Sequence, residues 1–199
     1  MEYVFQIKNK HSDSTKVLTK PLFKEVEHLS SFISPSKHCL FHNDVFNYHE
    51  DKKELIILHS STRSNSNIPA ILHVVGNKTF GRHTNKKLLY RCTPDDDRLP
   101  DFIVPYEPKK QKFNKNTCNL YVTIQFAEWK PNKPPVGTIV QTIGPVNILK
   151  NFYEYQLYCK CLNISLKTFD KQAREVIHGK CFDELIQKIQ NKYSNIEDR

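Results

Sequence analysis

The clearest pattern in this chain is an alternation with a period of two over residues 120–127. Apolar side chains occupy the even positions, from Leu120 to Phe126. The odd positions hold Tyr121, Thr123, Gln125 and Ala127. A period of two is typical of a β-strand with one face in a hydrophobic core. Trp129 follows in phase with the odd positions. It is predicted to cap one end of the core, with base stacking as the alternative.

Four other stretches between residues 70 and 161 have the composition of short strands, and glycines and prolines supply turns between several of them. These predicted strands are Ala70–Val75, Lys87–Cys92, Val136–Ile143 and Phe152–Cys161. Five short strands, without a helix long enough for a crossover, favour a small closed or nearly closed barrel. The sequence therefore predicts a mainly β fold built on a small barrel of the oligonucleotide-binding (OB, or cold-shock) type.

The chain before this barrel is less regular. Residues 1–60 contain three strand-like stretches and one or two helical turns, which indicates a partial or divergent first OB-like domain. These predicted elements are strands at Tyr3–Ile7, His38–Phe46 and Glu54–His59, and helical turns within Phe23–Phe32. The serine- and asparagine-rich segment 61–68 is predicted to be a linker, and residues 69–164 are predicted to form a second OB-like domain.

The last part of the chain, residues 165–199, changes to a helical period. Ser165 can cap a helix, and Gly179 interrupts the pattern before a second amphipathic stretch. The apolar residues at helical spacing are Leu166, Phe169, Ala173, Val176 and Ile177, then Phe182, Leu185, Ile186 and Ile189. We expect a helical C-terminal extension whose apolar faces pack on its own domain, with docking to a partner as the alternative.

Positive charge is concentrated in the middle of the chain. The formal net charge is +9, and residues 70–160 carry fourteen basic against seven acidic side chains, whereas the segments on either side each have a net charge of +1. Lysine supplies most of the basic residues and asparagine is plentiful, so a bias in genome composition is one explanation. Such a bias would spread the excess evenly, so its concentration in one segment favours a polyanionic partner there.

A series of short motifs follows the predicted strands in a definite order. Segment Thr93–Val104 reads TPDDDRLPDFIV, and the later motifs are Tyr121–Trp129, Pro135–Val140, Ile143–Pro145, and Glu154 with Leu157. This series resembles the second cold-shock domain of the ribonuclease II/R family, which includes the exoribonuclease subunit of the eukaryotic exosome. In that family a "TP.D.RIP.I.I" segment precedes a strand that ends in Trp. Upstream, Leu40–Val45 (LFHNDV) is similar to the close of the family's first cold-shock domain.

The resemblance covers about residues 40–165 and implies OB domains that bind RNA beside a 3′–5′ exoribonuclease domain. That catalytic domain holds magnesium with a cluster of aspartates, and no such cluster follows here. The acidic run Asp95–Asp97 lies in the barrel motif, where the family has no metal centre. The resemblance therefore implies a chain without catalytic residues or a cofactor of its own, with Mg²⁺ needed only where a separate catalytic domain is present.

Basic and aromatic residues on one surface are what an OB domain needs to bind phosphates and bases. Two groups in the basic segment have this composition, and each residue could instead belong to the core or to a solvated loop. The first group is Lys78, Phe80, Arg82, Lys86, Lys87, Tyr90 and Arg91. The second group, in a polar loop, is Lys109, Lys110, Lys112, Phe113 and Lys115.

Other chemistry has weaker support. His38, Cys39, His42 and His49 could be drawn into a zinc site, but the paired Cys-x-x-Cys spacing typical of such sites is absent. Cys159 and Cys161 would share one face of the last predicted strand, where they more readily fill a core than carry out redox chemistry. No phosphate-binding glycine loop and no signature of a nucleophilic enzyme is present.

The cellular location is predicted from features that the sequence lacks. It contains no apolar run long enough to span a membrane and no export signal at its start. Its six cysteines have no framework spacing, which indicates reduced thiols in the cytoplasm or nucleus and not a secreted protein.

Taken together, these features favour an RNA-binding OB module that holds single-stranded RNA for a separate catalytic or complex subunit. Two alternatives remain. The chain could be a split piece or excerpt of an active exoribonuclease, or a degenerate OB protein that serves as a structural or assembly subunit.

Overall fold

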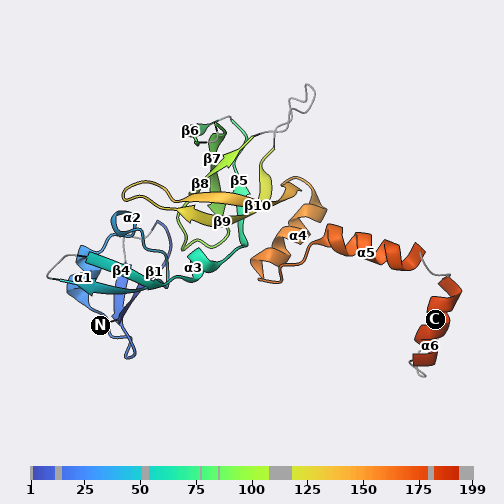
Figure 1. Cartoon of the computed structure of the whole chain (residues 1–199), viewed down its shortest axis with the longest axis horizontal. Helices are drawn as coiled ribbons and strands as arrows, with labels where there is room; N and C mark the ends of the chain where they lie inside the picture. The colour runs from blue at the N-terminus through green and yellow to red at the C-terminus, as the bar shows by residue number, and fades with distance from the viewer. Residues whose placement is uncertain are drawn as a thin grey trace. The chain divides into compact units, whose positions relative to one another are not determined.

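The computed structural model describes residues 2–11, 15–50, 54–76, 78–84, 86–107, 118–178 and 182–192 (Figure 1). The chain divides into two compact units, residues 1–162 and residues 163–199. The first unit contains an antiparallel sheet and a β-barrel, and the second contains two helices. Among the described residues, no helix combines the length and the apolar character needed to cross a membrane.

The N-terminal part of the first unit is a four-stranded antiparallel sheet with strand order β2-β1-β3-β4. Its elements are β1 (Glu2–Ile7), β2 (Thr15–Thr19), α1 (Glu27–Phe32), α2 (Pro35–His38), β3 (Val45–His49) and β4 (Glu54–His59). Phe5 and Phe46 are fully buried on one face of the sheet, where Leu29 of α1 packs against them. In the described part of this region the sheet stays open and does not close into a barrel.

The prediction of a strand at His38–Phe46 is wrong over most of this range. Cys39 and Asn43 have φ angles of 57° and 63°, and this left-handed conformation is incompatible with a continuous strand. The backbone therefore leaves α2, turns, and enters β3 only at Val45. The sequence also gave no indication of β2.

The second part of the first unit is a closed five-stranded barrel. Its strands are β5 (Ile68–Leu72), β7 (Leu88–Pro94), β8 (Phe102–Tyr106), β9 (Leu120–Glu128) and β10 (Val136–Pro145). They pair in the order β5-β9-β10-β8-β7, and β7 pairs again with β5 to close the ring. The β8–β10 pairing is parallel and the other pairings are antiparallel. This is the arrangement of an OB barrel, so the predicted fold class is confirmed.

The interior of the barrel follows the predicted alternation. Val122 and Ile124 of β9 are fully buried, and the neighbouring strands add Ala70, Leu72, Cys92, Phe102 and Val104. A short extra strand, β6 (Thr79–Arg82), pairs with the first residues of β7, before the part of β7 that pairs with β5. Trp129, just past β9, packs on the ring of Phe41 with a centroid separation of 4.6 Å. It caps the core, as expected.

The prediction of a last strand at Phe152–Cys161 is wrong. Residues 149–159 form the helix α4 (Leu149–Cys159), and the fifth barrel strand is β8 instead. The buried residues of α4 are Asn151, Glu154, Tyr155 and Tyr158, which is the i, i+3, i+4, i+7 spacing of a helix face. Tyr155 stacks on Tyr121 of β9 with ring centroids 4.3 Å apart, so α4 covers the outer face of the barrel.

The segment predicted to be a linker packs against the barrel. It contains the short helix α3 (Ser61–Ser64), and the Ser60 hydroxyl accepts a hydrogen bond from the Arg63 backbone N–H at 3.3 Å. The Arg63 guanidinium lies 4.6 Å from the Phe126 ring and 5.3 Å from the Phe41 ring, within the range of cation–π interactions. Arg63 also donates a hydrogen bond to the Cys39 carbonyl at 2.6 Å.

The second unit consists of α5 (Leu166–His178) and α6 (Phe182–Lys192), as the helical spacing predicts. The Ser165 hydroxyl accepts from the Thr168 backbone N–H at 3.4 Å, consistent with its predicted role as a cap. Phe169 of α5 is 61% exposed. At this position the apolar face is not packed within its own unit.

Candidate nucleic-acid interface

The outer surface of β7 and β8 presents the side chains that do not enter the barrel. On β7, Tyr90 and Cys92 point inward, and Arg91 lies exposed on the opposite face. On β8 the exposed face carries Ile103, which pairs with Arg91 in the ladder. In OB folds this face, formed by the second and third barrel strands, is the one that binds oligonucleotides.

A hollow of about 190 Å³ lies beside Arg91 on this surface. It is lined by His73, Val75, Lys78, Phe80, Arg91 and Asn119. Lys78 directly precedes β6, Phe80 lies within β6, and Arg91 comes from β7. Three residues predicted from the sequence to bind nucleic acid are therefore brought together. We refer to this feature as the Arg91 hollow.

The walls of the Arg91 hollow are held by local hydrogen bonds. The Asn119 side-chain oxygen accepts from the backbone N–H groups of Val74 and Val75 at 3.1 and 3.2 Å, which fixes the turn after β5. His73 is tied to β7 by its backbone N–H, which donates to the Arg91 carbonyl at 2.9 Å, and by its ring, with Nε2 2.9 Å from the Thr93 hydroxyl. These bonds fix the positions of His73 and Asn119 in the walls of the hollow.

The positive charge of the hollow comes from Lys78 and Arg91. Burial lowers the pKa of His73, and the neighbouring Arg91 lowers it further. The imidazole is therefore neutral at neutral pH. Phe80 is 43% exposed and adds an aromatic surface beside the two cations.

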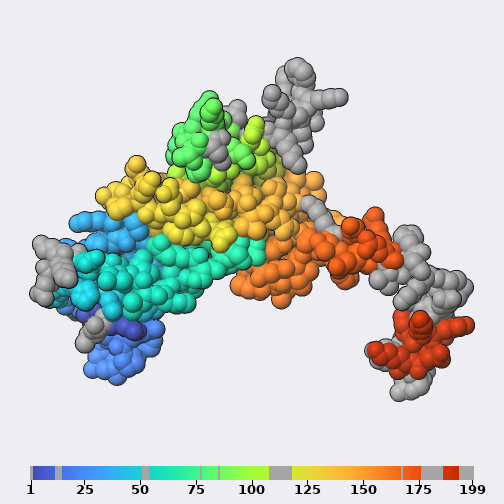
Figure 2. All heavy atoms as spheres, in the orientation of Figure 1, coloured from blue at the N-terminus to red at the C-terminus, as the bar shows by residue number. Residues whose placement is uncertain are grey.

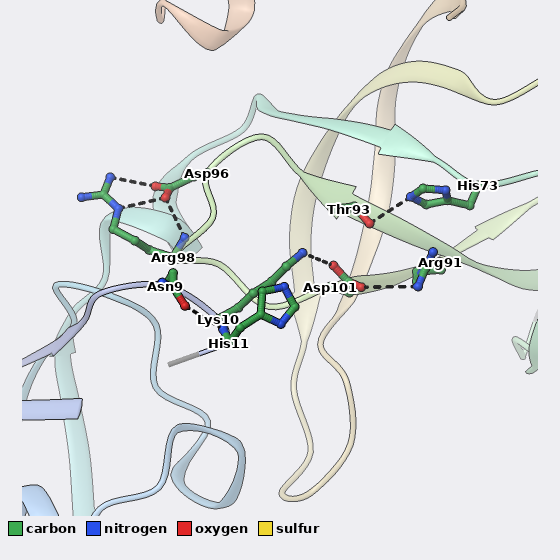
Figure 3. Close-up of polar contacts among 9 residues, drawn as sticks. All are labelled: Asn9, Lys10, His11, His73, Arg91, Thr93, Asp96, Arg98 and Asp101. Carbon is green, nitrogen blue, oxygen red and sulfur yellow. Dashed lines mark hydrogen bonds and ion pairs between the residues drawn. The ribbon is translucent and has the colours of Figure 1, made fainter. Parts of the chain in front are cut away.

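Arg91 shares an acidic neighbour with a lysine from the N-terminal region (Figure 3). Asp101 accepts a hydrogen bond from Lys10 Nζ at 2.7 Å, whereas its other oxygen lies 4.0 Å from Arg91 Nη1. The longer separation exceeds hydrogen-bond length. Lys10 is therefore the closer partner of Asp101, and the Arg91 guanidinium, with half of its side chain exposed, can still donate to a phosphate.

Three more predicted cations lie on the hairpin that joins β6 to β7. Arg82, Lys86 and Lys87 are exposed. The hairpin is closed by backbone hydrogen bonds from His83 to the Lys87 carbonyl and from Lys86 to the His83 carbonyl, both 2.9 Å. Figure 2 shows this region, in green, as a projection from the body of the barrel. It extends the basic surface beyond the Arg91 hollow.

One predicted site residue, Tyr90, is buried and does not lie on the outer surface. Tyr90 is 3% exposed and belongs to the barrel core, with its ring 6.0 Å from that of Tyr106. Because adjacent residues of a strand face opposite sides, Tyr90 and Arg91 cannot both lie on the outer surface. The predicted loop group lies outside the described residues: Lys109, Lys110, Lys112, Phe113 and Lys115.

The sequence did not identify His73, Asn119 or Lys10 as part of this surface. Lys10 meets Asp101 across 91 positions of sequence, so no local spacing could indicate the contact. The alternation of β5 and β9 is the signal that could have suggested the other two. His73 directly follows β5, which pairs with β7, and Asn119 directly precedes β9, which pairs with β5.

The other candidate chemistry gains no support. Within the described ranges, no three His, Cys, Asp or Glu side chains are grouped to hold a metal ion; His42 Nδ1 instead accepts from the Ile7 backbone N–H at 3.1 Å. The two cysteines do not share a strand face, because Cys159 ends α4 and Cys161 lies beyond it with a φ of 59°. Burial raises the pKa of the Cys159 thiol to about 12, so it stays protonated at neutral pH.

No family model and no curated protein matches this chain. The likeness to the ribonuclease II/R family therefore rests on the short motifs of the sequence alone.

Proposed function

We propose that this chain binds single-stranded RNA on the outer face of β7 and β8. The observation that carries the proposal is the Arg91 hollow, where Lys78, Phe80 and Arg91 converge on the ligand-binding face of an OB barrel. Cations beside an exposed aromatic ring suit a nucleic-acid strand, because the charges can contact phosphates while the ring stacks on a base. Every base has a π face, so binding of this kind tolerates many sequences.

RNA is proposed over DNA because of the resemblance to the ribonuclease II/R family. The motif Thr93–Val104 comprises the end of β7, the following loop and most of β8, so it borders the proposed binding face. In this proposal the chain holds RNA for a separate catalytic subunit. An excerpt of an active exoribonuclease and a degenerate assembly subunit remain the alternatives.

The proposal is tested by fluorescence anisotropy with labelled single-stranded RNA and DNA of the same sequence. Phe80→Ala should weaken RNA binding about tenfold, since one stacked base contributes roughly 1–3 kcal/mol. Phe23→Ala is the matched control, because Phe23 is 56% exposed and lies in the N-terminal sheet region. Equal affinity of the wild-type chain and Phe80→Ala would contradict the proposed site, and stronger binding of DNA would contradict the choice of RNA.

A nuclease assay on the same preparation separates the binding proposal from the enzyme alternative. With Mg²⁺ present, the proposed binding module leaves the labelled RNA intact. Stepwise release of nucleotides from the 3′ end would instead support the exoribonuclease alternative.

A further inference from the structure

A second and larger hollow lies between the N-terminal sheet region and the loops of the barrel. Its volume is about 560 Å³, which falls in the range of small-ligand sites. The N-terminal side supplies residues of β1, α1 and α2, and the barrel side supplies Arg98, Pro100 and Trp129. We call it the Trp129 pocket.

Hydrogen bonds join the two sides of the Trp129 pocket. The Asn132 backbone N–H donates to the Ser36 carbonyl at 2.9 Å, and the Lys10 backbone N–H donates to the Asp97 carbonyl at 2.7 Å. The Cys39 thiol lies 3.5 Å from the Trp129 carbonyl. Contacts within the chain therefore hold the two sides of the pocket together.

The lining combines an apolar floor with a polar rim. Phe5, Ile33 and Leu40 are at most 2% exposed and form part of the lining. At the rim, the hydroxyls of Ser34 and Ser36 lie 3.2 Å apart and each has further hydrogen-bonding capacity. An apolar slot with hydroxyls at its edge suits a flat heteroaromatic ring that carries polar atoms.

The two cations of the pocket are already neutralised. Lys10 is paired with Asp101 at 2.7 Å, and Arg98 is paired with Asp96 at 2.8 Å through its Nε (Figure 3). The Arg98 hydrogen bond holds the pKa of the Asp96 carboxyl below its usual range, so the pair is fully ionised at neutral pH. The pocket therefore favours a neutral group such as a base over a free phosphate.

The Trp129 pocket and the Arg91 hollow meet at one carboxylate. Asp101 contacts Lys10, which lines the pocket, and Arg91, which lines the hollow. Figure 3 shows Asp101 between these two side chains. Lys10, Asp101 and Arg91 therefore connect the two features through side-chain contacts.

We propose that the Trp129 pocket receives one unstacked base of the RNA strand bound at the Arg91 hollow. The proposal rests on the proposed function and adds a second contact point for the same strand. The base enters beside Trp129, and the serine hydroxyls form hydrogen bonds with its polar edge. The paired cations contribute little to the affinity.

Trp129 is the only tryptophan of the chain, so its fluorescence reports directly on the pocket. Labelled single-stranded RNA is titrated into the full chain, with anisotropy measuring binding and Trp129 emission measuring occupancy. Ser36→Phe fills the pocket from its rim, where the native hydroxyl has Ser34 as its side-chain partner among the described residues. Ser66→Phe is the matched control at an exposed serine that lines neither hollow. Circular dichroism verifies that both variants fold.

The wild-type chain and Ser66→Phe should show quenching of Trp129 emission with the same midpoint as the anisotropy change. Ser36→Phe should lose the quenching and bind about tenfold more weakly, as expected for one lost stacked base. Its affinity should keep the wild-type dependence on salt, because no phosphate contact is removed.

Two results would overturn the pocket assignment and leave the proposed function standing: RNA binding with unchanged Trp129 emission, or quenching that persists in Ser36→Phe. Absence of any anisotropy change in the wild-type chain would overturn both proposals.

Discussion

Phe41 offers a direct test of how the N-terminal region contributes to the barrel. Its side chain is 1% exposed and belongs to the barrel core, although the residue precedes the barrel by 27 positions of sequence. Its ring stacks on Phe102 with centroids 5.8 Å apart, meets Phe126 edge-on at 5.5 Å, and lies 4.6 Å from Trp129. Replacing Phe41 by alanine removes all three contacts.

The expected cost follows from burial and ring geometry. A buried Phe→Ala substitution lowers the free energy of unfolding by about 3–5 kcal/mol, and the aromatic pairs add to the area term, so we expect about 4 kcal/mol. With a urea m-value of about 2 kcal/mol/M for a small domain, the unfolding midpoint should fall by about 2 M. Phe32→Ala is the matched control, because Phe32 is 45% exposed.

The assay is urea denaturation followed by circular dichroism, which does not depend on the emission of the neighbouring Trp129. A midpoint for Phe41→Ala within about 0.5 M of the Phe32→Ala midpoint would refute the assignment of Phe41 to the barrel core.

Three further predictions concern a turn, an ion pair and a group of four lysines. Gly144 has a φ of 152°, and a Cβ there would overlap the side chain of Asn151. Gly144→Ala should therefore lower the free energy of unfolding by about 3 kcal/mol, and Gly76→Ala, where the strain is in the backbone alone, should lower it by about 1 kcal/mol. Equal melting temperatures of the two variants in thermal unfolding would contradict this. Arg98→Met should raise the pKa of Asp96 towards its ordinary value in an NMR titration. In the wild-type chain the stabilisation from ionised Asp96 is complete above its unfolded pKa and is lost as the pH falls through the lower folded value; an unchanged Asp96 pKa in the variant would refute the pairing. Replacing Lys109, Lys110, Lys112 and Lys115 should weaken binding to all RNA sequences alike and reduce the salt slope by roughly 0.7 for each lost contact; an unchanged slope would mean that these lysines make no phosphate contact.

The strands of the barrel were predictable where their side chains alternate. β9 shows this most clearly, because its even positions face the core and the pattern is visible in the sequence alone. Helix α4 was missed because Phe152, Tyr153, Tyr155 and Tyr158 give the segment the aromatic composition of a strand. The i, i+3, i+4, i+7 spacing of its buried residues was present in the sequence, but a polar Asn and a polar Glu occupy two of those positions.

The sequence predicted which residue types form the candidate site better than it predicted where their side chains lie. The basic and aromatic character of residues 78–91 indicated the surface on which the Arg91 hollow lies. The alternation of β7 would have excluded Tyr90, since Arg91 is the outward residue of that pair. The contact of Lys10 with Asp101 depends on how the N-terminal region packs on the barrel, and a periodicity within either segment carries no information about it.

The most direct test of the central claim is the salt dependence of RNA binding with and without the cations of the Arg91 hollow. Affinity for a single-stranded RNA is measured by anisotropy over a series of salt concentrations for the wild-type chain and for the double variant Lys78→Ala/Arg91→Ala. Lys20→Ala/Lys24→Ala is the control, because it removes the same charge from exposed positions in the N-terminal region. The account predicts weaker binding and a salt slope lower by roughly 1.4 for the hollow variant only, as two phosphate contacts on a single strand would give. Equal slopes and affinities for the two double variants would contradict it.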